Sequence, residues 1–310
     1  MSGSKISQSF SRNRDGAGID ARGRIDIFDS EILDNAVTLN GVGGGLVVRG
    51  ANQAVTIERT LIKGNTAPLQ GGGAWLEPVS LHLVDSELDS NGASLGGGMY
   101  LVALTPSGPI IERSTFFANT SNSGGGLYLQ GPPTVTTSQH TLRNTTFSEN
   151  EYCATGCGGG GIFVSNTGWP TTLVLEHVTF VQNNMFGSGS GKGEPVSNLG
   201  TPHLVTTVNS IFEGPCDGAV TSGGGNWMDA RGDCGHDPLI DGAPGVYPAV
   251  AGTRLKPLAY MSPGFTRVYD EWGRSPSLNN PKCVAAITSE DQRGAPRPVG
   301  ASCDIGAVER

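Results

Sequence analysis

The sequence predicts an all-β protein, a right-handed parallel β-helix (a solenoid) of about eight three-stranded coils with a disulfide-bearing C-terminal cap. Three observations predict it: a repeated apolar-x-x-Asn unit, a glycine cluster after most units, and apolar residues spaced two apart around them. Repeats at intervals of roughly 20–35 residues are typical of solenoids. The chain also has 48 glycines among 310 residues and only 15% charged residues, a composition that disfavours long helices.

The repeating unit is an apolar anchor followed three positions later by asparagine. The units are Phe10/Asn13, Ile32/Asn35, Ile62/Asn65, Leu88/Asn91, Phe116/Asn119, Phe147/Asn150 and Phe180/Asn183, and an eighth anchor is Phe212. The glycine clusters end at Gly18, Gly45, Gly73, Gly98, Gly126 and Gly161. We expect the asparagines to stack in a ladder that satisfies the backbone of the turns, and the glycines to permit tight turns and close stacking of coils.

Each anchor is preceded by a predicted strand and a bend. Residues seven and five positions before the anchor are mostly apolar, as in Val55/Ile57, and predict the inward positions of a strand. The alternation of inward and outward side chains breaks before the anchor, so a bend is expected three positions ahead of it. Asn and Asp tolerate the left-handed backbone conformation that such a bend requires. This bend column reads Asp29, Arg59, Asp85, Arg113, Asn144, His177 and Asn209. Its acidic and basic residues would pair between neighbouring coils.

The strand after each glycine cluster carries the candidate binding surface. The outward column of these strands reads Asp20, Val47, Trp75, Tyr100, Tyr128 and Phe163. Its four aromatic residues, about 4.8 Å apart, would form a solvent-facing stripe beside Arg49, Glu77 and Gln130. Such a stripe suits sugar rings or a partner protein. The alternative is that the rings stack for stability alone or are covered by a loop.

The regular pattern fades near residue 215. We therefore predict two domains, 1–215 for the β-helix coils and 216–310 for a C-terminal capping segment packed on them. The chain opens in mid-repeat at Ile6–Asn13, which indicates a fragment of a longer protein. The strand edges of this open first coil could template self-association.

The cysteines favour an oxidising compartment. They lie at Cys153, Cys157, Cys216, Cys234, Cys283 and Cys303. Their even number and sequential pairing favour disulfides over free buried thiols. The Cys153-x-x-x-Cys157 spacing is not that of a zinc site, even with His140 or His177 nearby, so a small disulfide loop is expected. No cofactor or metal is predicted, although a structural calcium ion is compatible with the fold class.

Charge and hydropathy limit the partners. The formal net charge is −8 and is spread without long runs, which disfavours nucleic acid or an anionic membrane as the main partner. No stretch approaches the ~18 apolar residues of a membrane helix, so no membrane insertion is expected. The first residues lack the apolar core of an export signal.

Several motifs in the last third of the chain carry a family resemblance. They are Asn209-Ser-Ile-Phe212, Ser222-Gly-Gly-Gly-Asn226, Asp237-Pro-Leu239, Ser262-Pro263, Asp291-Gln-Arg-Gly294, Arg297-Pro298 and Cys303-Asp-Ile-Gly-Ala-Val-Glu309. With the repeats, these motifs resemble right-handed β-helix repeat proteins of the choice-of-anchor type, and the repeats are similar to those of polymorphic outer-membrane proteins. One departure is Ser262-Pro-Gly-Phe-Thr, where the family usually has Ser-Pro-Ala-Ile-Asp. The resemblance implies an extracellular or cell-surface protein with disulfides Cys216–Cys234 and Cys283–Cys303, and no agreed enzymatic activity.

We therefore expect an adhesin-like or structural module that binds a polysaccharide or a surface protein along the aromatic stripe. The alternative is a carbohydrate-active enzyme, either a polysaccharide lyase or a glycoside hydrolase. A hydrolase needs two carboxylates about 5–10 Å apart, but the outward acids Glu58, Glu112 and Glu176 are separated in their column by Val84 and Arg143. The pattern therefore identifies no catalytic residue. A third interpretation is a self-associating filament subunit.

Overall fold

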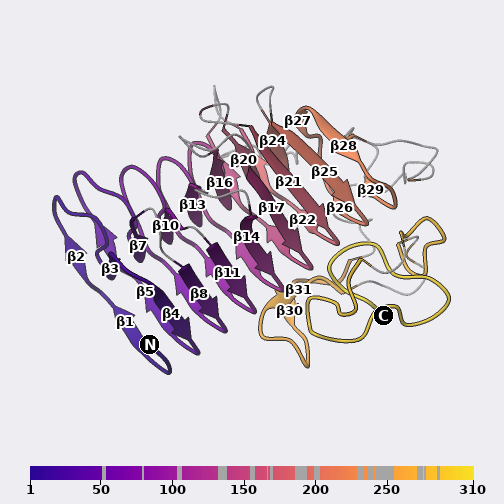
Figure 1. The fold of residues 1–310 in the computed structure, drawn as a ribbon, viewed down its shortest axis with the longest axis horizontal. Coiled ribbons are helices and arrows are strands. Elements are labelled where there is room, and N and C mark those ends of the chain that lie inside the picture. Colours follow the sequence, from indigo (N-terminus) through magenta and orange to yellow (C-terminus); the bar gives the residue numbers. More distant parts are fainter. Residues whose placement is uncertain are drawn as a thin grey trace.

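A computed structural model shows a parallel β-solenoid with a C-terminal segment along its side (Figure 1). It describes residues 1–50, 54–78, 80–102, 107–131, 138–153, 158–165, 167, 170–185, 194–198, 203–228, 234–235, 241, 255–270, 275, 277–284 and 287–310. This part of the chain is all-β and contains no helix, so none is present that could cross a membrane. The predicted fold class is confirmed.

Three long parallel sheets form the walls of the solenoid. The anchor sheet contains β1 (Lys5–Ser7), β5 (Glu31–Leu33), β9 (Leu61–Lys63), β12 (Glu87–Asp89), β15 (Thr115–Phe117), β18 (Thr146–Ser148), β22 (Thr179–Val181), β26 (Ile211–Phe212) and β29 (Trp227–Met228). The post-glycine sheet contains β3 (Ile19–Ala21), β7 (Leu46–Val48), β10 (Ala74–Leu76), β13 (Met99–Val102), β16 (Leu127–Gln130), β20 (Ile162–Val164), β24 (Val196–Asn198) and β27 (Asp217–Gly218).

The third sheet, here called the long-strand sheet, precedes the anchors in each turn. It contains β4 (Ile25–Phe28), β8 (Ala54–Glu58), β11 (Ser80–Val84), β14 (Ser107–Glu112), β17 (Ser138–Arg143), β21 (Thr171–Glu176), β25 (Leu204–Val208) and β28 (Val220–Ser222). Three short two-stranded pairs complete the described strands. They are β2 (Phe10–Ser11) with β6 (Ala36–Val37), β19 (Glu151–Tyr152) with β23 (Asn184–Met185), and the antiparallel β30 (Ala259–Tyr260) with β31 (Arg267–Val268).

Six turns of the described solenoid have paired neighbours on both sides in all three sheets, from β7–β8–β9 to β24–β25–β26. One less regular turn lies at each end. In β3–β4–β5 two of the three strands are sheet edges, and in β27–β28–β29 all three are. The number of fully paired turns is therefore slightly smaller than the eight coils predicted. Strand pairing also continues beyond residue 215, as far as Met228.

The bend column adopts the predicted conformation. All seven of its residues have positive φ, between 45° at Asn144 and 54° at His177. The predicted charge pairing is also present, because the Arg59 guanidinium lies 2.6 Å from Asp29 and that of Arg113 lies 2.9 Å from Asp85. The break in alternation ahead of each anchor is thus a sharp corner between the long-strand sheet and the anchor sheet.

The glycine clusters form the corner that leads into the post-glycine sheet. Gly96 opens one cluster with a φ of 63°, which side chains other than glycine rarely adopt. At Gly98, a Cβ atom would lie 2.5 Å from the carbonyl oxygen of Gly126 in the next turn. The clusters therefore provide both the tight corner and the close stacking of turns that the sequence predicts.

The asparagines form a continuous buried ladder inside the third corner. Each Nδ2 donates to Oδ1 of the next asparagine, at 2.9–3.1 Å, from Asn35 to Asn183. Each Oδ1 also accepts the backbone N–H of the preceding asparagine in the ladder, as Asn119 does from Asn91 at 3.0 Å. The second Nδ2 hydrogen reaches a backbone carbonyl, that of Ile62 in the case of Asn91. Buried backbone groups at this corner are thereby satisfied.

The predicted anchor of the first repeat, Phe10, is wrong. Ile6, not Phe10, pairs with Ile32 in the anchor sheet, and Phe10 is 75% exposed and pairs with Ala36. The ladder position in this turn is Ser9, whose backbone N–H donates to Asn35 Oδ1 at 3.0 Å. Because Ser9 stands where the other repeats have asparagine, the apolar-x-x-Asn pattern first matches later, at Phe10/Asn13.

The solenoid interior combines stacked rings with a few buried polar side chains, among them His140. Phe116, Phe147, Phe180 and Phe212 stack face to face, with centroids 4.6–5.1 Å apart. His140 occupies the same inward-facing column as Leu173 of the next turn, and it is 1% exposed. Its Nε2 contacts Ser138 Oγ at 3.1 Å, and its Nδ1 has no partner among the described residues. Burial lowers the pKa of His140 to about 3, so the ring is neutral in the folded protein.

The C-terminal segment lies along the anchor sheet and the bend column rather than only across the end of the solenoid (Figure 1). Gln292 donates through Nε2 to the carbonyl of Ser114 and to Thr115 Oγ1, at 3.0 and 2.9 Å. The Ala307 N–H donates to Thr179 Oγ1 at 2.9 Å. These contacts fix the segment against several turns at once.

The motifs that carry the family resemblance form the polar interior of this segment. Asp291, which is fully buried, accepts the N–H groups of Ala295 and Glu309, each at 3.0 Å. The buried Glu309 carboxylate accepts the N–H groups of Val299 and Asp304, at 2.8 and 2.9 Å. The presence of these motif residues is therefore accounted for by the backbone hydrogen bonds that they make within the C-terminal segment.

The ladder gives the first testable prediction. Asn91→Ala removes the acceptor of the Asn65 N–H and the donor to the Ile62 carbonyl, and leaving buried polar groups unsatisfied costs about 1–3 kcal/mol each. We expect the free energy of unfolding to fall by about 3 kcal/mol in urea denaturation. The control Asn13→Ala, at an exposed asparagine of the same sequence motif, should change it by less than about 0.5 kcal/mol. Equal effects of the two variants would contradict the ladder.

A second prediction concerns acid stability. Between pH 6.5 and about 3 the unfolded chain binds a proton at His140 that the folded protein does not. Stability due to this residue is therefore lost as the pH falls, by about 1.4 kcal/mol per pH unit. We expect His140→Leu, which copies Leu173 of the next turn, to reduce the slope of unfolding free energy against pH by that amount. An unchanged slope would show that His140 is not buried in the neutral form.

Candidate functional site

The aromatic stripe forms in the predicted register. Trp75, Tyr100, Tyr128 and Phe163 are direct neighbours in the post-glycine sheet and belong to a cluster separate from the main core. Their rings stack, with centroids 6.5, 4.8 and 5.0 Å apart in chain order. The column therefore points out of the solenoid interior, as the alternation of side chains predicts.

The expectation that the stripe faces solvent is wrong. Tyr100, Tyr128 and Phe163 are only 4%, 8% and 7% exposed. Tyr100 and Tyr128 each lie between two neighbouring rings and Phe163 stacks on Tyr128. Val102 and Leu95 pack against the same cluster. Burial raises the pKa of Tyr100, whose hydroxyl hydrogen-bonds Gln130. This arrangement agrees with stacking for stability and leaves little of these three rings available to a ligand.

The N-terminal end of the stripe is more open. Trp75 is half-buried, and its indole N–H donates to Gln70 Oε1 at 3.0 Å. The Arg49 guanidinium lies 5.3 Å from the centroid of this ring and pairs with Asp15. Burial raises the pKa of the neighbouring Glu77, and the charge of Arg49 opposes this effect. The structure thus brings Arg49 and Glu77 to Trp75, and Gln130 to the buried part of the stripe.

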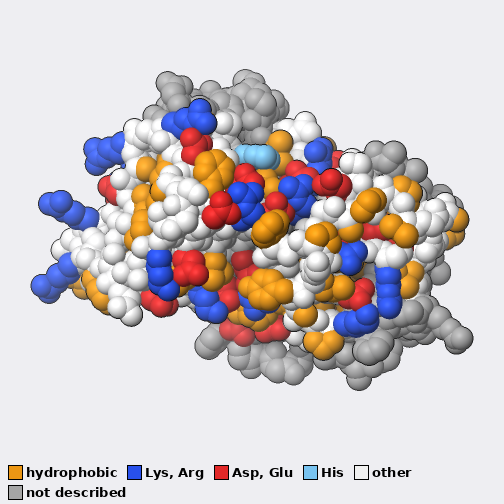
Figure 2. Space-filling model, turned by 90° about the horizontal axis from the view of Figure 1, so that it is seen from below, with side chains coloured by type: hydrophobic (Ala, Val, Ile, Leu, Met, Phe, Trp, Pro, Cys, Tyr) orange, Lys and Arg blue, Asp and Glu red, His pale blue; other side chains and the backbone are white. Residues whose placement is uncertain are grey.

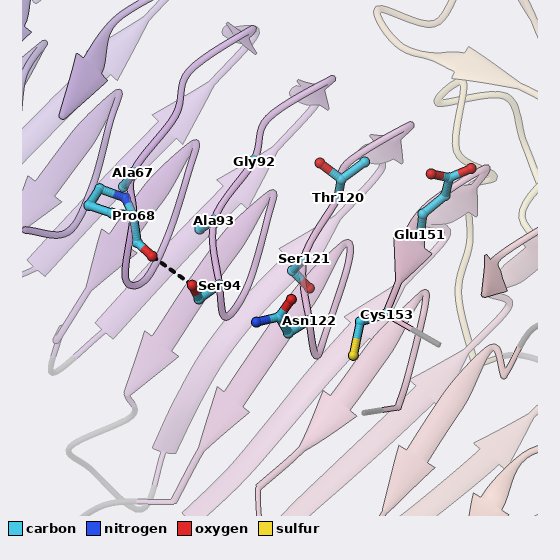
Figure 3. A pocket seen from close by; sticks show the side chains of 10 residues that line it. All are labelled: Ala67, Pro68, Gly92, Ala93, Ser94, Thr120, Ser121, Asn122, Glu151 and Cys153. Atoms are coloured by element: carbon cyan, nitrogen blue, oxygen red, sulfur yellow. Dashed lines mark hydrogen bonds between the residues drawn. The ribbon is translucent and has the colours of Figure 1, made fainter. Parts of the chain in front are cut away.

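A groove runs along the solenoid beside the asparagine ladder (Figure 3). It has a volume of about 440 Å³. Figure 3 shows two facing rows of residues, one with Gly92, Thr120 and Glu151 and the other with Ser94 and Asn122. Small side chains in neighbouring turns create this space, which is lined by Ala67, Pro68, Gly92, Ala93, Ser94, Thr120, Ser121, Asn122, Glu151 and Cys153. No aromatic side chain is among these described lining residues.

A second cleft lies where the β30–β31 hairpin covers the bend column. It has a volume of about 280 Å³ and is lined by Asp29, Ser30, Glu31, Arg59, Thr60, Leu61, Asp85, Glu87, Tyr260 and Phe265. Tyr260 and Phe265 are 63% and 58% exposed. The Arg59 guanidinium lies 5.8 Å from the centroid of the Phe265 ring. Around the hairpin, hydrophobic, acidic and basic side chains alternate on one face of the molecule (Figure 2).

The hairpin is held rigidly above this cleft. The Arg267 Nε donates to Glu87 Oε1 at 2.7 Å, and its Nη2 donates to Asp89 Oδ2 at 2.8 Å. The guanidinium also lies 4.0 Å from the centroid of the Phe117 ring. Thr115 Oγ1 donates to the Arg267 carbonyl at 2.6 Å. The two exposed rings are therefore presented from a fixed support.

Sequence reasoning missed this cleft. Tyr260 and Phe265 lie outside the repeats, so no column of equivalent positions pointed to them. One signal was present, the unusual Ser262-Pro-Gly-Phe-Thr, in which Phe265 and Thr266 stand where the β-helix proteins that the sequence resembles usually have Ile and Asp. In the structure Thr266 Oγ1 donates to the Arg113 carbonyl at 3.2 Å, and Phe265 is exposed at the cleft.

The five described cysteines are disulfide-bonded and are not free to act as metal ligands. Cys216–Cys234 and Cys283–Cys303 are bonded, as the resemblance implied. Cys153 is also disulfide-bonded, and Cys157 lies outside the described residues. His177 approaches Cys283 and Cys303, with the three potential ligand atoms within 4.8 Å of one another. Because these two sulfurs are bonded to each other, they are not available as thiolate ligands.

Comparison with protein-family models, with curated proteins and with solved structures finds no match to this chain.

The burial of the stripe gives a third prediction. Tyr128→Ala removes a ring that is 8% exposed and stacked on both faces. We expect the free energy of unfolding to fall by about 3 kcal/mol, as for other buried aromatic residues, measured by urea denaturation. A change below about 0.5 kcal/mol would instead indicate an exposed ring.

Proposed function

We propose that this protein is an extracellular or cell-surface module that binds polysaccharide at the cleft beneath the β30–β31 hairpin. The observation that carries the proposal is the exposure of two aromatic side chains, Tyr260 and Phe265, at one cleft that also presents charged and hydroxyl groups. Sugar rings stack their C–H faces on aromatic rings, while their hydroxyls need such hydrogen-bonding partners.

The location of the cleft also suits a polymer. Its floor combines bend-column and anchor-sheet residues from neighbouring turns, which are about 4.8 Å apart. Charged groups such as those of Asp29 and Arg59 therefore recur along the solenoid axis at a spacing comparable with the length of a sugar residue. A chain lying along the axis would contact several turns. The buried rings of the stripe lack this accessibility.

The cellular setting is inferred from two observations. Disulfides persist in oxidising environments, and two of them, Cys216–Cys234 and Cys283–Cys303, lie in the C-terminal part of the structure. The resemblance to choice-of-anchor β-helix proteins and to polymorphic outer-membrane proteins also favours an exported, adhesin-like role. The adhesin-like role and the location outside the cell are parts of the same proposal.

Binding is favoured over cleavage by the state of the cleft carboxylates. Asp29 and Asp85 are held by arginines at 2.6 and 2.9 Å, and Glu31 lies 3.1 Å from Lys5. The hydrogen bond from Arg59 lowers the pKa of Asp29, whereas the general acid of a glycoside hydrolase requires a raised pKa. Asp29 is therefore suited to accept hydrogen bonds from a ligand rather than to donate a proton.

The fourth prediction tests the site. Phe265→Ala and Tyr260→Ala each remove an exposed ring, so folding should be unaffected and polysaccharide affinity should fall about tenfold, or about 1.4 kcal/mol. Affinity electrophoresis against neutral, acidic and amino polysaccharides would measure the effect, with reducing-end and unsaturated products assayed in parallel. The matched control is Ala93→Phe, which fills the groove of Figure 3 and should leave binding unchanged.

Two outcomes would overturn this proposal. Loss of binding in Ala93→Phe but not in Phe265→Ala would place the ligand in the groove. Release of products from any polysaccharide by the folded wild-type protein would identify an enzyme.

A further inference from the structure

We propose that the hairpin cleft selects polysaccharides that carry free, protonated amino groups over neutral or N-acetylated ones. This inference rests on the proposed function, because it names the ligand class of the same site. It is drawn from the charge balance of the cleft, from the two exposed rings, and from contacts in which the protein's own cations already occupy aromatic faces.

Carboxylates outnumber basic groups around the cleft. Three arginines are each shared by two or three carboxylates. The pairs are Arg59 with Asp29 and Glu58, Arg113 with Asp85, Glu112 and Glu290, and Arg267 with Glu87 and Asp89. With Glu31 and the lysines Lys5 and Lys63, the region has eight carboxylates and five basic side chains. The resulting negative field attracts a cation and disfavours an anionic polysaccharide.

The aromatic rings are suited to the same charge. The faces of Tyr260 and Phe265 carry the negative end of the ring quadrupole, which attracts cations. The region already contains two such contacts, Arg59 at 5.8 Å from the Phe265 centroid and Arg267 at 4.0 Å from that of Phe117. An amino sugar combines an apolar C–H face, which stacks on a ring, with an ammonium group beside it.

The carboxylates provide the matching acceptors. An ammonium group has three N–H donors and no acceptor, so each of its hydrogens can meet a carboxylate oxygen. Asp29 and Glu31 are the most accessible acidic side chains of the cleft lining, with side chains 49% and 48% exposed. N-acetylation removes both the charge and two of these donors. The cleft should therefore distinguish the two forms of one sugar.

The test uses oligomers of β-1,4-linked glucosamine and of N-acetylglucosamine, equal in length, at a pH where the free amine is protonated. We expect at least about tenfold tighter binding of the glucosamine oligomer by isothermal titration calorimetry. This preference should shrink when salt is raised from about 50 mM to about 500 mM, because salt screens exposed charges.

Matched variants separate the cleft from the overall negative charge. Asp29→Asn should weaken glucosamine-oligomer binding about fivefold and leave N-acetylglucosamine binding unchanged, since it removes one charge and leaves Arg59 less neutralised. Asp20→Asn removes the same charge at an exposed position in the post-glycine sheet and should change neither affinity.

The outcomes are distinguishable. Equal affinity for the two oligomers, abolished by Phe265→Ala, would overturn the selectivity and leave the proposed function intact. Binding of neither these oligomers nor any polysaccharide in the panel would overturn both. Binding of oligolysine without binding of either sugar oligomer would identify the cleft as a site for basic peptides and would also overturn both.

Discussion

The hydrogen-bonded asparagine ladder is the interaction on which the rest of the structure depends. Each rung joins two successive turns through one side chain-to-side chain bond and one bond to the backbone, as in Asn65 with Asn91. This fixes the register of successive turns from Asn35 to Asn183, so equivalent residues stand in columns. A slip of one residue would exchange inward and outward side chains in all three sheets.

The columns determine which side chains the outer surface of the solenoid exposes and which it buries. Where a column holds large rings, as from Tyr100 to Phe163, the spacing of the turns is close to the thickness of a stacked ring, so the rings cover one another. Where a column holds charged residues, as at Asp29 and Arg59, the ion pairs lie at the surface. The C-terminal segment docks on this charged corner, and its hairpin contributes the exposed rings that the repeats do not supply.

Periodic features could be predicted from the sequence, because a repeated residue type records a repeated environment. The bend column and the ladder are examples. The anchor of the first turn, Ile6, does not follow from the pattern, because Ser9 stands where the repeat has asparagine. The exposure of the stripe could not be predicted, since periodicity gives the direction of a side chain but not what covers it. The cleft was missed because Tyr260 and Phe265 reach it from non-repeating sequence, over contacts about 150 residues apart such as Thr266 with Arg113.

The central claim is that the hairpin and the bend column form one ligand site on a rigid, ladder-fixed solenoid. Hydrogen exchange with and without a bound glucosamine oligomer tests it most directly. Peptides from residues 255–268 and from 29–33 and 59–63 should gain protection together, while ladder peptides should be slow to exchange in both states. Protection confined to residues 92–94 and 120–122, or to one wall of the cleft, would contradict the account.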